Sequence, residues 1–464
     1  MKNSNKKVLL FISLSFLLLL VESCFTGQLS PYWPSVSNVD ILSDIKQFPA
    51  SAPSGSKGSL LAARSVAPVA DSLTIPKASS DSLSFAHYLL PRVFVDFRKD
   101  TTRPALPAIM KKLEALKSGQ KVKVRIAWFG DSLIEGDLIT QTVRELLQNN
   151  FSGNHGVGFV PFKSITSGFR ISAIARSSDS WVDDNFKTRS YKDPLFLSGH
   201  VFYSPSGRLS LRDNTVKDSS QVLEKWLICG PVDSNTVITV NKTAIPITAS
   251  RLFNRVLIEK SSKKLINLTA PSTWTALYGV SCEPEYGVMI DNFSFRGISG
   301  FELARFDEAF LDEIAQSGAY DLIVIQYGVN VMFRAHDKNY AYYLKGMDPA
   351  LKKLKQHFPH AEFLMVSCSD RAFRYGTEWK TAVGMDSLLK TQATLAFTNG
   401  IPFFNMYQTM GGNGTIVKWV EGPERLASKD YIHPSPRGAA ILGNLFYNAF
   451  MNDYHKLPKK RAYN

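Results

Sequence analysis

The chain has 464 residues, of which 44% are hydrophobic and 12% aromatic, and its formal net charge is +14. This length and composition exclude a predominantly disordered chain and leave room for two or three domains with cores of their own. The basic balance favours polyanionic surroundings such as cell-wall polymers or lipid headgroups. Nucleic acid is not expected as a partner, because the sequence contains no zinc-finger spacing and no RNA-binding aromatic motif.

Residues 1–23 have the pattern of an export signal. Lysines at positions 2, 6 and 7 precede an apolar run over 8–20 that is short for a transmembrane helix. Cys24 follows a small residue at the end of this pattern and resembles the lipidated cysteine of bacterial lipoproteins. Ordinary signal cleavage is the alternative. We therefore expect an exported protein in the periplasm or at the cell surface, held at the membrane by a lipid on Cys24.

Residues 24–83 are rich in Ser, Pro, Ala and Gly and have no sustained hydrophobic period. This composition predicts a flexible tether. Beyond Cys24 the chain has only Cys229, Cys282 and Cys368, which gives neither a disulfide framework nor a CxxC metal site. Cys229 and Cys282 lie in one β-rich stretch and could pair in an oxidising compartment, but the sequence leaves their distance open.

Residues 84–190 begin an α/β domain. The spacing of apolar residues predicts a helix over 106–120, and the apolar stretch 121–130 predicts a buried strand. A polar turn and a helix follow over 131–151. Strand, tight turn and helix are the start of a βαβ layer.

Residues 191–295 have a different pattern: short runs in which apolar and polar residues alternate, separated by Asn, Asp, Lys and Gly. This pattern predicts an inserted β-sandwich or jelly roll. The α/β alternation returns over 296–455, with expected helices over 301–318, 347–359, 379–400 and 436–453 and expected strands over 321–328, 361–368 and 401–407. The fold class is therefore an α/β domain with a parallel sheet covered on both faces, interrupted by a β domain.

Ser132 is the first candidate for chemistry, because it follows the expected strand 121–130 and precedes a helix. A hydroxyl there stands above the sheet, close to backbone N–H donors. His433 is the one histidine of eight with an acidic residue at a suggestive spacing, since Asp430 precedes it by three residues. In a tight turn Asp430 could hold the imidazole in the tautomer that accepts the serine proton.

Stabilising the oxyanion of a tetrahedral intermediate requires donors at the same sheet edge. Asn330 follows the strand 321–328, and its side-chain amide could donate there. Gly300 follows another expected strand, and its backbone N–H is a second candidate, beside that of Ser132. Each feature alone is also explained by an ordinary turn. Ordinary turns do not explain four such features in this order, each at the carboxyl end of a strand.

Four short blocks resemble those of the SGNH (GDSL-type) hydrolases: Gly130-Asp131-Ser132, Gly300, Gly328-x-Asn330 and Asp430-x-x-His433. They are spread over 121–450, outside the β-rich insertion. The resemblance implies a flavodoxin-like, three-layer α/β/α fold, with no cofactor and no metal.

The same resemblance implies Ser132 as nucleophile, His433 as general base and then acid, and Asp430 as its orienting carboxylate. The N–H groups of Ser132 and Gly300 and the Asn330 amide would form the oxyanion hole.

A narrower resemblance concerns the segments "GNHGVGFVPF" and "LASKDYIHPSPRGAAILG" together with the position of the insertion. They resemble envelope SGNH proteins that act on O-acetyl groups of peptidoglycan and carry an inserted carbohydrate-binding β-module. We therefore expect a serine esterase that deacetylates a cell-envelope polysaccharide. The alternatives are an O-acetyltransferase with the same triad, an acetylxylan-type esterase, and a non-catalytic glycan-binding lipoprotein. Trp226, Trp274 and Tyr278 could stack on sugars or belong to the core.

Overall fold

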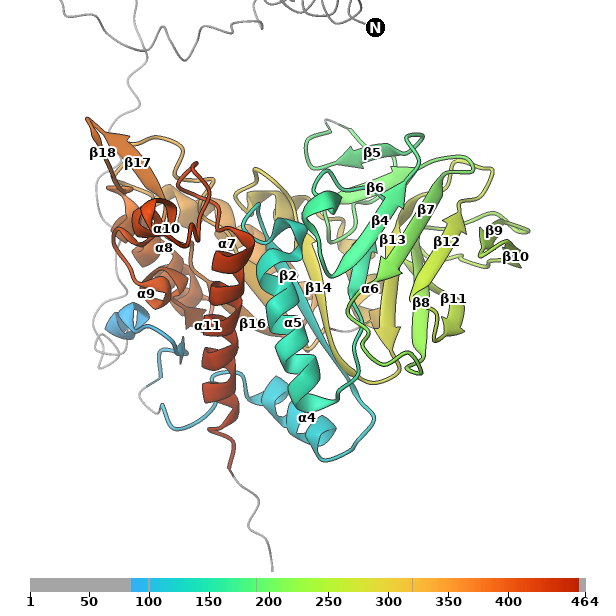
Figure 1. The fold of residues 1–464 in the computed structure, drawn as a ribbon, viewed down its shortest axis with the longest axis horizontal. Coiled ribbons are helices and arrows are strands. Elements are labelled where there is room, and N and C mark those ends of the chain that lie inside the picture. Colours follow the sequence, from blue (N-terminus) through green and yellow to red (C-terminus); the bar gives the residue numbers. More distant parts are fainter. Residues whose placement is uncertain (1–84, 99–100, 189, 319, 459–464) are drawn as a thin grey trace, which may run out of the picture. The chain divides into compact units, whose positions relative to one another are not determined.

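The computed structural model describes residues 85–98, 101–188, 190–318 and 320–458 (Figure 1). The predicted export signal over 1–23, Cys24 and the predicted tether over 24–83 lie outside these residues. In the part of the chain that is described, no helix is long and apolar enough to cross a membrane.

A six-stranded sheet forms the centre of the α/β domain, in the order β1-β19-β16-β15-β2-β14. Its strands are β1 Phe94–Val95, β2 Lys123–Gly130, β14 Gly287–Ser294, β15 Leu322–Gln326, β16 Glu362–Val366 and β19 Phe403–Phe404. Five strands are parallel, and four of them, β2, β15, β16 and β19, were expected in a parallel sheet. The edge strand β1 is antiparallel to β19 and was not predicted.

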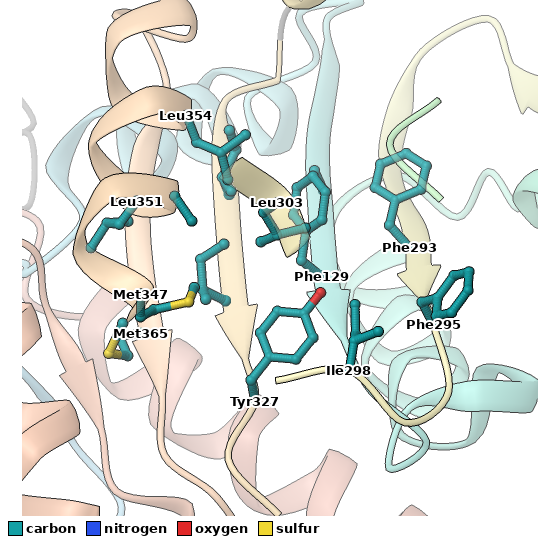
Figure 2. Packing of buried hydrophobic residues seen from close by; sticks show 14 of the residues in the cluster. Phe129, Phe293, Phe295, Ile298, Leu303, Tyr327, Met347, Leu351, Leu354 and Met365 are labelled. Carbon is teal, nitrogen blue, oxygen red and sulfur yellow. The ribbon is translucent and has the colours of Figure 1, made fainter. Parts of the chain in front are cut away.

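Helices cover both faces of this sheet. One face is covered by α4 Pro107–Lys117, α5 Leu138–Phe151 and α11 Pro436–Tyr454, and the other by α6 Glu308–Gly318, α7 Tyr342–His357 and α8 Met385–Thr398. Strand β2 is apolar from Ile126 to Gly130 because alternate residues there serve both layers. Ile126 and Trp128 pack in the first layer, and Phe129 packs in the second. Figure 2 shows Phe129 facing the same space as the residues of α7.

The chain leaves the α/β sheet after α5 and returns to it at β14. Residues 158–284 between them, here called the β module, form two antiparallel sheets that share one hydrophobic cluster. Their strands are β3 Gly158–Pro161, β4 Ala173–Ser177, β5 Val182–Asn185, β6 His200–Tyr203, β7 Arg208–Asp213, β8 Leu223–Cys229, β9 Val237–Val240, β10 Thr243–Pro246, β11 Asn254–Ser261, β12 Leu265–Thr269 and β13 Leu277–Pro284.

The boundaries of the β-rich insertion differ from the predicted range 191–295. Strands β3, β4 and β5 precede residue 191 and pair with module strands. Strand β14 lies inside the predicted range but pairs in parallel with β2. Hydrophobic alternation identifies a strand without identifying its partner, so the assignment of strands at both ends of the insertion was wrong.

Several predicted helices have other bounds. The segment 301–318 is divided into the 3₁₀ helix η5 Phe301–Arg305 and α6, and α7 begins earlier than predicted, at Tyr342. The predicted helix over 379–400 begins only at Met385, because residues before it form a hairpin of β17 Ala372–Tyr375 and β18 Glu378–Thr381. The remaining short elements are the 3₁₀ helices η2 Ala86–Leu89, η3 Glu135–Asp137 and η4 Ser167–Phe169 and the helices α9 Met406–Met410 and α10 Thr415–Glu421.

A buried ionic cluster joins the β module to the start of α5. The Asp137 carboxylate lies 2.6 Å from Nη1 of Arg144 and 3.3 Å from Nη2 of Arg170, and it accepts a hydrogen bond from Ser172 at 2.5 Å. Burial alone would raise the pKa of Asp137, but the two guanidinium groups outweigh it and hold that pKa well below its usual range. The cluster therefore fixes the module segment 170–172 beside the segment that follows Ser132.

Cys229, Cys282 and Cys368 are buried free thiols. In the β8–β13 pair Cys229 lies opposite Leu277, whereas Cys282 lies opposite Lys225, so the two cysteines are at different points along the pair. Burial raises the pKa of the Cys229 thiol to about 12. The pairing that the sequence left open is not formed.

Candidate active site

Ser132 lies in the tight turn that ends β2. Gly130 has room for no side chain, because a Cβ there would lie 2.8 Å from Ile134 and 3.0 Å from the carbonyl oxygen of Gln326. Oδ1 of Asp131 accepts a hydrogen bond of 2.9 Å from the N–H of Leu133, which closes the turn. The Ser132 side chain is thereby placed at the carboxyl edge of the sheet.

His433 reaches Ser132 from the loop before α11. This loop is closed by hydrogen bonds from the N–H of Ser428 to the His433 carbonyl and from the N–H of Ser435 to the Leu426 carbonyl. Ser435 also caps α11, with Pro436 in its first turn. The structure brings Nε2 of His433 to 2.7 Å from Oγ of Ser132, although the two residues are 301 positions apart.

Asp430 is the third member of a hydrogen-bonded series that runs from Ser132 through His433. Its Oδ2 lies 2.6 Å from Nδ1 of His433, and its Oδ1 accepts the backbone N–H groups of Ile432 and His433 at 3.0 Å each. Burial would raise the pKa of Asp430, but the hydrogen bonds from His433 outweigh it and lower the pKa to about 2. Asp430 is therefore ionised at neutral pH and favours the tautomer with a proton on Nδ1. That tautomer leaves Nε2 free to accept the serine proton.

The expected oxyanion donors come from the two strands beside β2. Gln326 of β15 and Ser294 of β14 are both register partners of Gly130, so the segments after all three strands begin at one edge of the sheet. Among the described residues, the N–H groups of Ser132 and Gly300 form no hydrogen bond. Two free backbone donors are what a developing oxyanion requires.

Asn330 and Gly300 belong to one connected corner. Nδ2 of Asn330 donates to the carbonyl of Ile298 at 2.9 Å, which ties it to the segment containing Gly300. The Asn330 side chain also acts on the neighbouring Asp131 carboxyl, whose pKa it helps to lower. Gly300 has a φ of +93°, and a Cβ there would lie 2.8 Å from both Met347 and Tyr327. Figure 2 shows Tyr327 beside Ile298, the residue whose carbonyl accepts the hydrogen bond from Asn330.

The hairpin that the sequence did not predict supports the His433 loop. The ring of Trp379 on β18 stacks on that of Tyr431 at 3.8 Å between centroids and 8° between planes. The N–H of Ala372 on β17 donates to the Tyr431 carbonyl. Tyr431 itself has a positive φ of 56°, an unusual conformation for a non-glycine residue. These contacts hold the loop in the conformation that presents His433.

Two further histidines have carboxylate partners. Nδ1 of His200 lies 2.8 Å from Asp183, and Nδ1 of His357 lies 2.6 Å from Asp312. Both partners are distant in sequence, so a search for fixed spacing could not find them. Within the described ranges only His433 also bonds a serine hydroxyl. Over the same ranges no group of three or more His, Cys, Asp or Glu is arranged to hold a metal.

Asp131, next to Ser132, is fully buried, and its Oδ2 has no hydrogen-bond partner. Burial raises the pKa of Asp131 to about 7, although the Leu133 N–H and His433 act against this. A raised pKa in the folded state stabilises the fold at low pH, and this contribution is lost as pH rises through the folded pKa.

We therefore expect Asp131→Asn to change the pH dependence of stability. From about pH 5 to about pH 8, the difference in free energy of unfolding between the variant and wild type should grow by about 2 kcal/mol in favour of the variant. Wild type must ionise a buried carboxyl over this range, and the variant has no carboxyl there. Urea denaturation at both pH values measures this, with the exposed Asp233→Asn as control. Identical pH dependence in wild type and Asp131→Asn would contradict the assignment.

Of the aromatic residues proposed to stack on sugars, Tyr278 is in the core, Trp226 is half-buried and packs against Arg255, and Trp274 is 64% exposed.

No family model matches the sequence, and no curated protein matches it. Among solved structures, a peptidoglycan O-acetylesterase matches with a TM-score of 0.64 and 19% identity, over 76% of this chain and 98% of that one. Family two carbohydrate esterases from Cellvibrio japonicus and from Clostridium thermocellum, the latter in complex with cellohexaose, each match with a TM-score of 0.25 and 10% identity. They cover 61% and 60% of this chain and 100% of their own, and similarity this low supports no argument. The chain therefore shares the fold of a peptidoglycan O-acetylesterase over nearly the whole of that protein.

Proposed function

We propose that the protein is a serine esterase that removes O-acetyl groups from a carbohydrate. The observation that carries this proposal is the hydrogen-bonded series from Ser132 Oγ to His433 to Asp430, with distances of 2.7 and 2.6 Å. The series stands at the sheet edge where free backbone donors meet. A serine, an imidazole and an orienting carboxylate in this order form the machinery of acyl transfer.

The geometry supports a two-step reaction. As Ser132 Oγ attacks the acetyl carbonyl carbon, Nε2 of His433 takes the hydroxyl proton, and the negative charge on the carbonyl oxygen is held by the free N–H donors. The intermediate collapses to an acetyl-enzyme, and the sugar oxygen leaves with the proton from His433. Water then loses a proton to His433 and attacks the acetyl-enzyme, which releases acetate and returns the proton to Ser132.

We further propose peptidoglycan as the substrate. The shared fold extends over nearly all of a peptidoglycan O-acetylesterase, and the net charge of +14 suits an anionic envelope polymer. The pattern of residues 1–23 supports export, and lipidation of Cys24 would hold the enzyme at the membrane that faces this polymer. The β module is proposed to contribute to glycan binding.

Acetate release from O-acetylated peptidoglycan and from acetylated xylan tests the substrate class. We expect acetate from peptidoglycan. Release from xylan alone would keep the chemistry and change the substrate to a plant-type glycan. Acetyl transfer to a glycan hydroxyl that is faster than acetate release would replace the esterase assignment by an acetyltransferase. No acetate release and no transfer would favour a glycan-binding protein.

A further inference from the structure

A cleft of about 490 Å³ lies between the α/β domain and the β module. We call it the module cleft; its lining includes Glu135, Ser294 and Arg296 of the α/β domain and Lys163, Lys187 and His200 of the module. Ser294 is the register partner of Gly130, and the N–H of Phe295, also in the lining, donates to the Gly130 carbonyl at 3.0 Å. Ser132 follows Gly130 by two residues, so the cleft opens at the same sheet edge as the nucleophile.

Two of the acidic side chains in the module cleft are paired with arginines. Glu135 lies 2.6 Å from Nη2 of Arg296, and Asp137 is held by the two buried arginines described above. Asp183 lies 2.8 Å from Nδ1 of His200, which offsets its charge only when the ring is protonated. The second arginine at Asp137 offsets the charge that remains on Asp183, so these groups together carry no net negative charge that would repel an anion.

Two lysines in the cleft lack such partners. Lys163 and Lys187 are exposed and form no ion pair with any described residue, and Asp179 is the one acid of the lining in the same condition. Nζ of Lys187 lies 5.8 Å from the ring centre of Phe295 and 3.7 Å from the position of a Cβ on Gly297. Gly297 lies three residues before Gly300, so this ammonium group lies at the start of the segment that leads to the proposed oxyanion corner.

An apolar rim accompanies these charges. Ile165, which lines the cleft, is 80% exposed, and Phe169, between the lining residues Ser167 and Arg170, is 68% exposed. Cβ of Phe169 lies 3.4 Å from the position of a Cβ on Gly136, four residues after Ser132. An exposed aromatic ring beside a polar cleft offers the flat apolar face on which a sugar ring can pack.

We propose that the module cleft binds a carboxylate-bearing glycan, with the carboxylate on Lys163 and Lys187 and a sugar ring against Phe169, while the acetyl group of a neighbouring sugar reaches Ser132. This inference rests on the proposed esterase function and goes further. It assigns recognition of the anionic part of the substrate to side chains outside the triad and gives the β module a direct share in the substrate site.

The test is the double substitution Lys163→Glu and Lys187→Glu. Soluble O-acetylated peptidoglycan fragments that carry peptide carboxylates serve as the glycan, and p-nitrophenyl acetate serves as a small ester that does not fill the cleft. We expect kcat/KM on the glycan to fall roughly tenfold or more, the scale of one charge-assisted hydrogen bond, mainly through KM. Hydrolysis of the small ester should stay within about twofold of wild type.

The double substitution Lys242→Glu and Lys263→Glu, in the turns β9–β10 and β11–β12, is the matched control, because it makes the same charge change at two lysines outside the cleft. It should act like wild type on both substrates. An unchanged KM for the glycan in the Lys163→Glu and Lys187→Glu variant, or equal losses on both substrates, would overturn the proposal. Failure of the esterase assignment is a separate outcome, because the wild type itself would then release no acetate from the glycan.

Discussion

Ser132→Ala is expected to lower the rate of acetate release by about 10⁴-fold or more while leaving the fold intact. The variant lacks the oxygen that His433 contacts at 2.7 Å, so no acetyl-enzyme can form. Loss of the Ser132 hydroxyl should cost little stability, because the side chain of its partner His433 is 28% exposed and can bond water instead. Rates on O-acetylated glycan and on p-nitrophenyl acetate should fall together, because both reactions require the same nucleophile.

Ser118→Ala is the control for this substitution. Ser118 caps the end of α4 with an exposed hydroxyl that donates to the Ala115 carbonyl. It precedes β2, whereas Ser132 follows it, so the two serines lie at opposite ends of that strand. The activity of the Ser118→Ala variant should equal that of wild type. If Ser132→Ala kept more than about a hundredth of the activity, the role of nucleophile would have to pass to another group.

Asp430→Asn is expected to lower kcat by roughly 10³-fold or more, although the substitution is nearly isosteric. The asparagine amide would donate to Nδ1 of His433, whereas the carboxylate accepts from it at 2.6 Å. The imidazole would then carry its proton on Nε2, where it cannot accept the serine proton. Reversal of the tautomer affects the chemical step, so KM for the glycan should change little.

Asp312→Asn is the matched control, because Asp312 makes the same kind of contact with Nδ1 of His357 at 2.6 Å. The His357 pair has no serine, and its loss should leave kcat unchanged. Circular dichroism and thermal unfolding of both variants separate loss of fold from loss of chemistry. Equal losses of kcat in the two variants would show that the effect is structural and would contradict the role given to Asp430.

The α/β domain could be predicted because its strands are buried on both faces. Strand β2 is apolar from Ile126 onward, and helices with regular apolar spacing precede and follow it. In such a layer the carboxyl ends of all parallel strands meet at one edge. Residues as distant as Ser132 and Asn330 could therefore be assigned to one site from the order of elements alone, and His433 was added from its spacing to Asp430.

The boundaries of the β module could not be predicted because they depend on pairing. Strand β14 alternates like a sandwich strand, yet all but its last residue is buried, since it pairs with β2. The hairpin β17–β18 was also missed. Its side chains are mostly exposed or half-buried, and its role depends on Trp379 meeting Tyr431 from a distant part of the chain.

The electrostatics of the site could likewise not be predicted from the sequence. Asp131 was assigned only to a turn, since burial without a partner for Oδ2 depends on residues packed around it from other strands. The free lysines of the module cleft are a similar case. Lys163 and Lys187 look like ordinary surface lysines until the fold places both in the lining of the cleft, with Lys187 beside Phe295 and Gly297.

The most direct test of the central claim is to identify the residue that becomes acetylated during turnover. Wild-type enzyme is mixed with O-acetylated peptidoglycan fragments, quenched in acid within the first turnovers and mapped by peptide mass spectrometry. The proposed mechanism predicts one acetyl group, on Ser132, that is absent from Ser132→Ala and decays at the rate of acetate release. An acetyl group on another residue, or acetate release with no acetylated intermediate under conditions that trap one on p-nitrophenyl acetate, would contradict it.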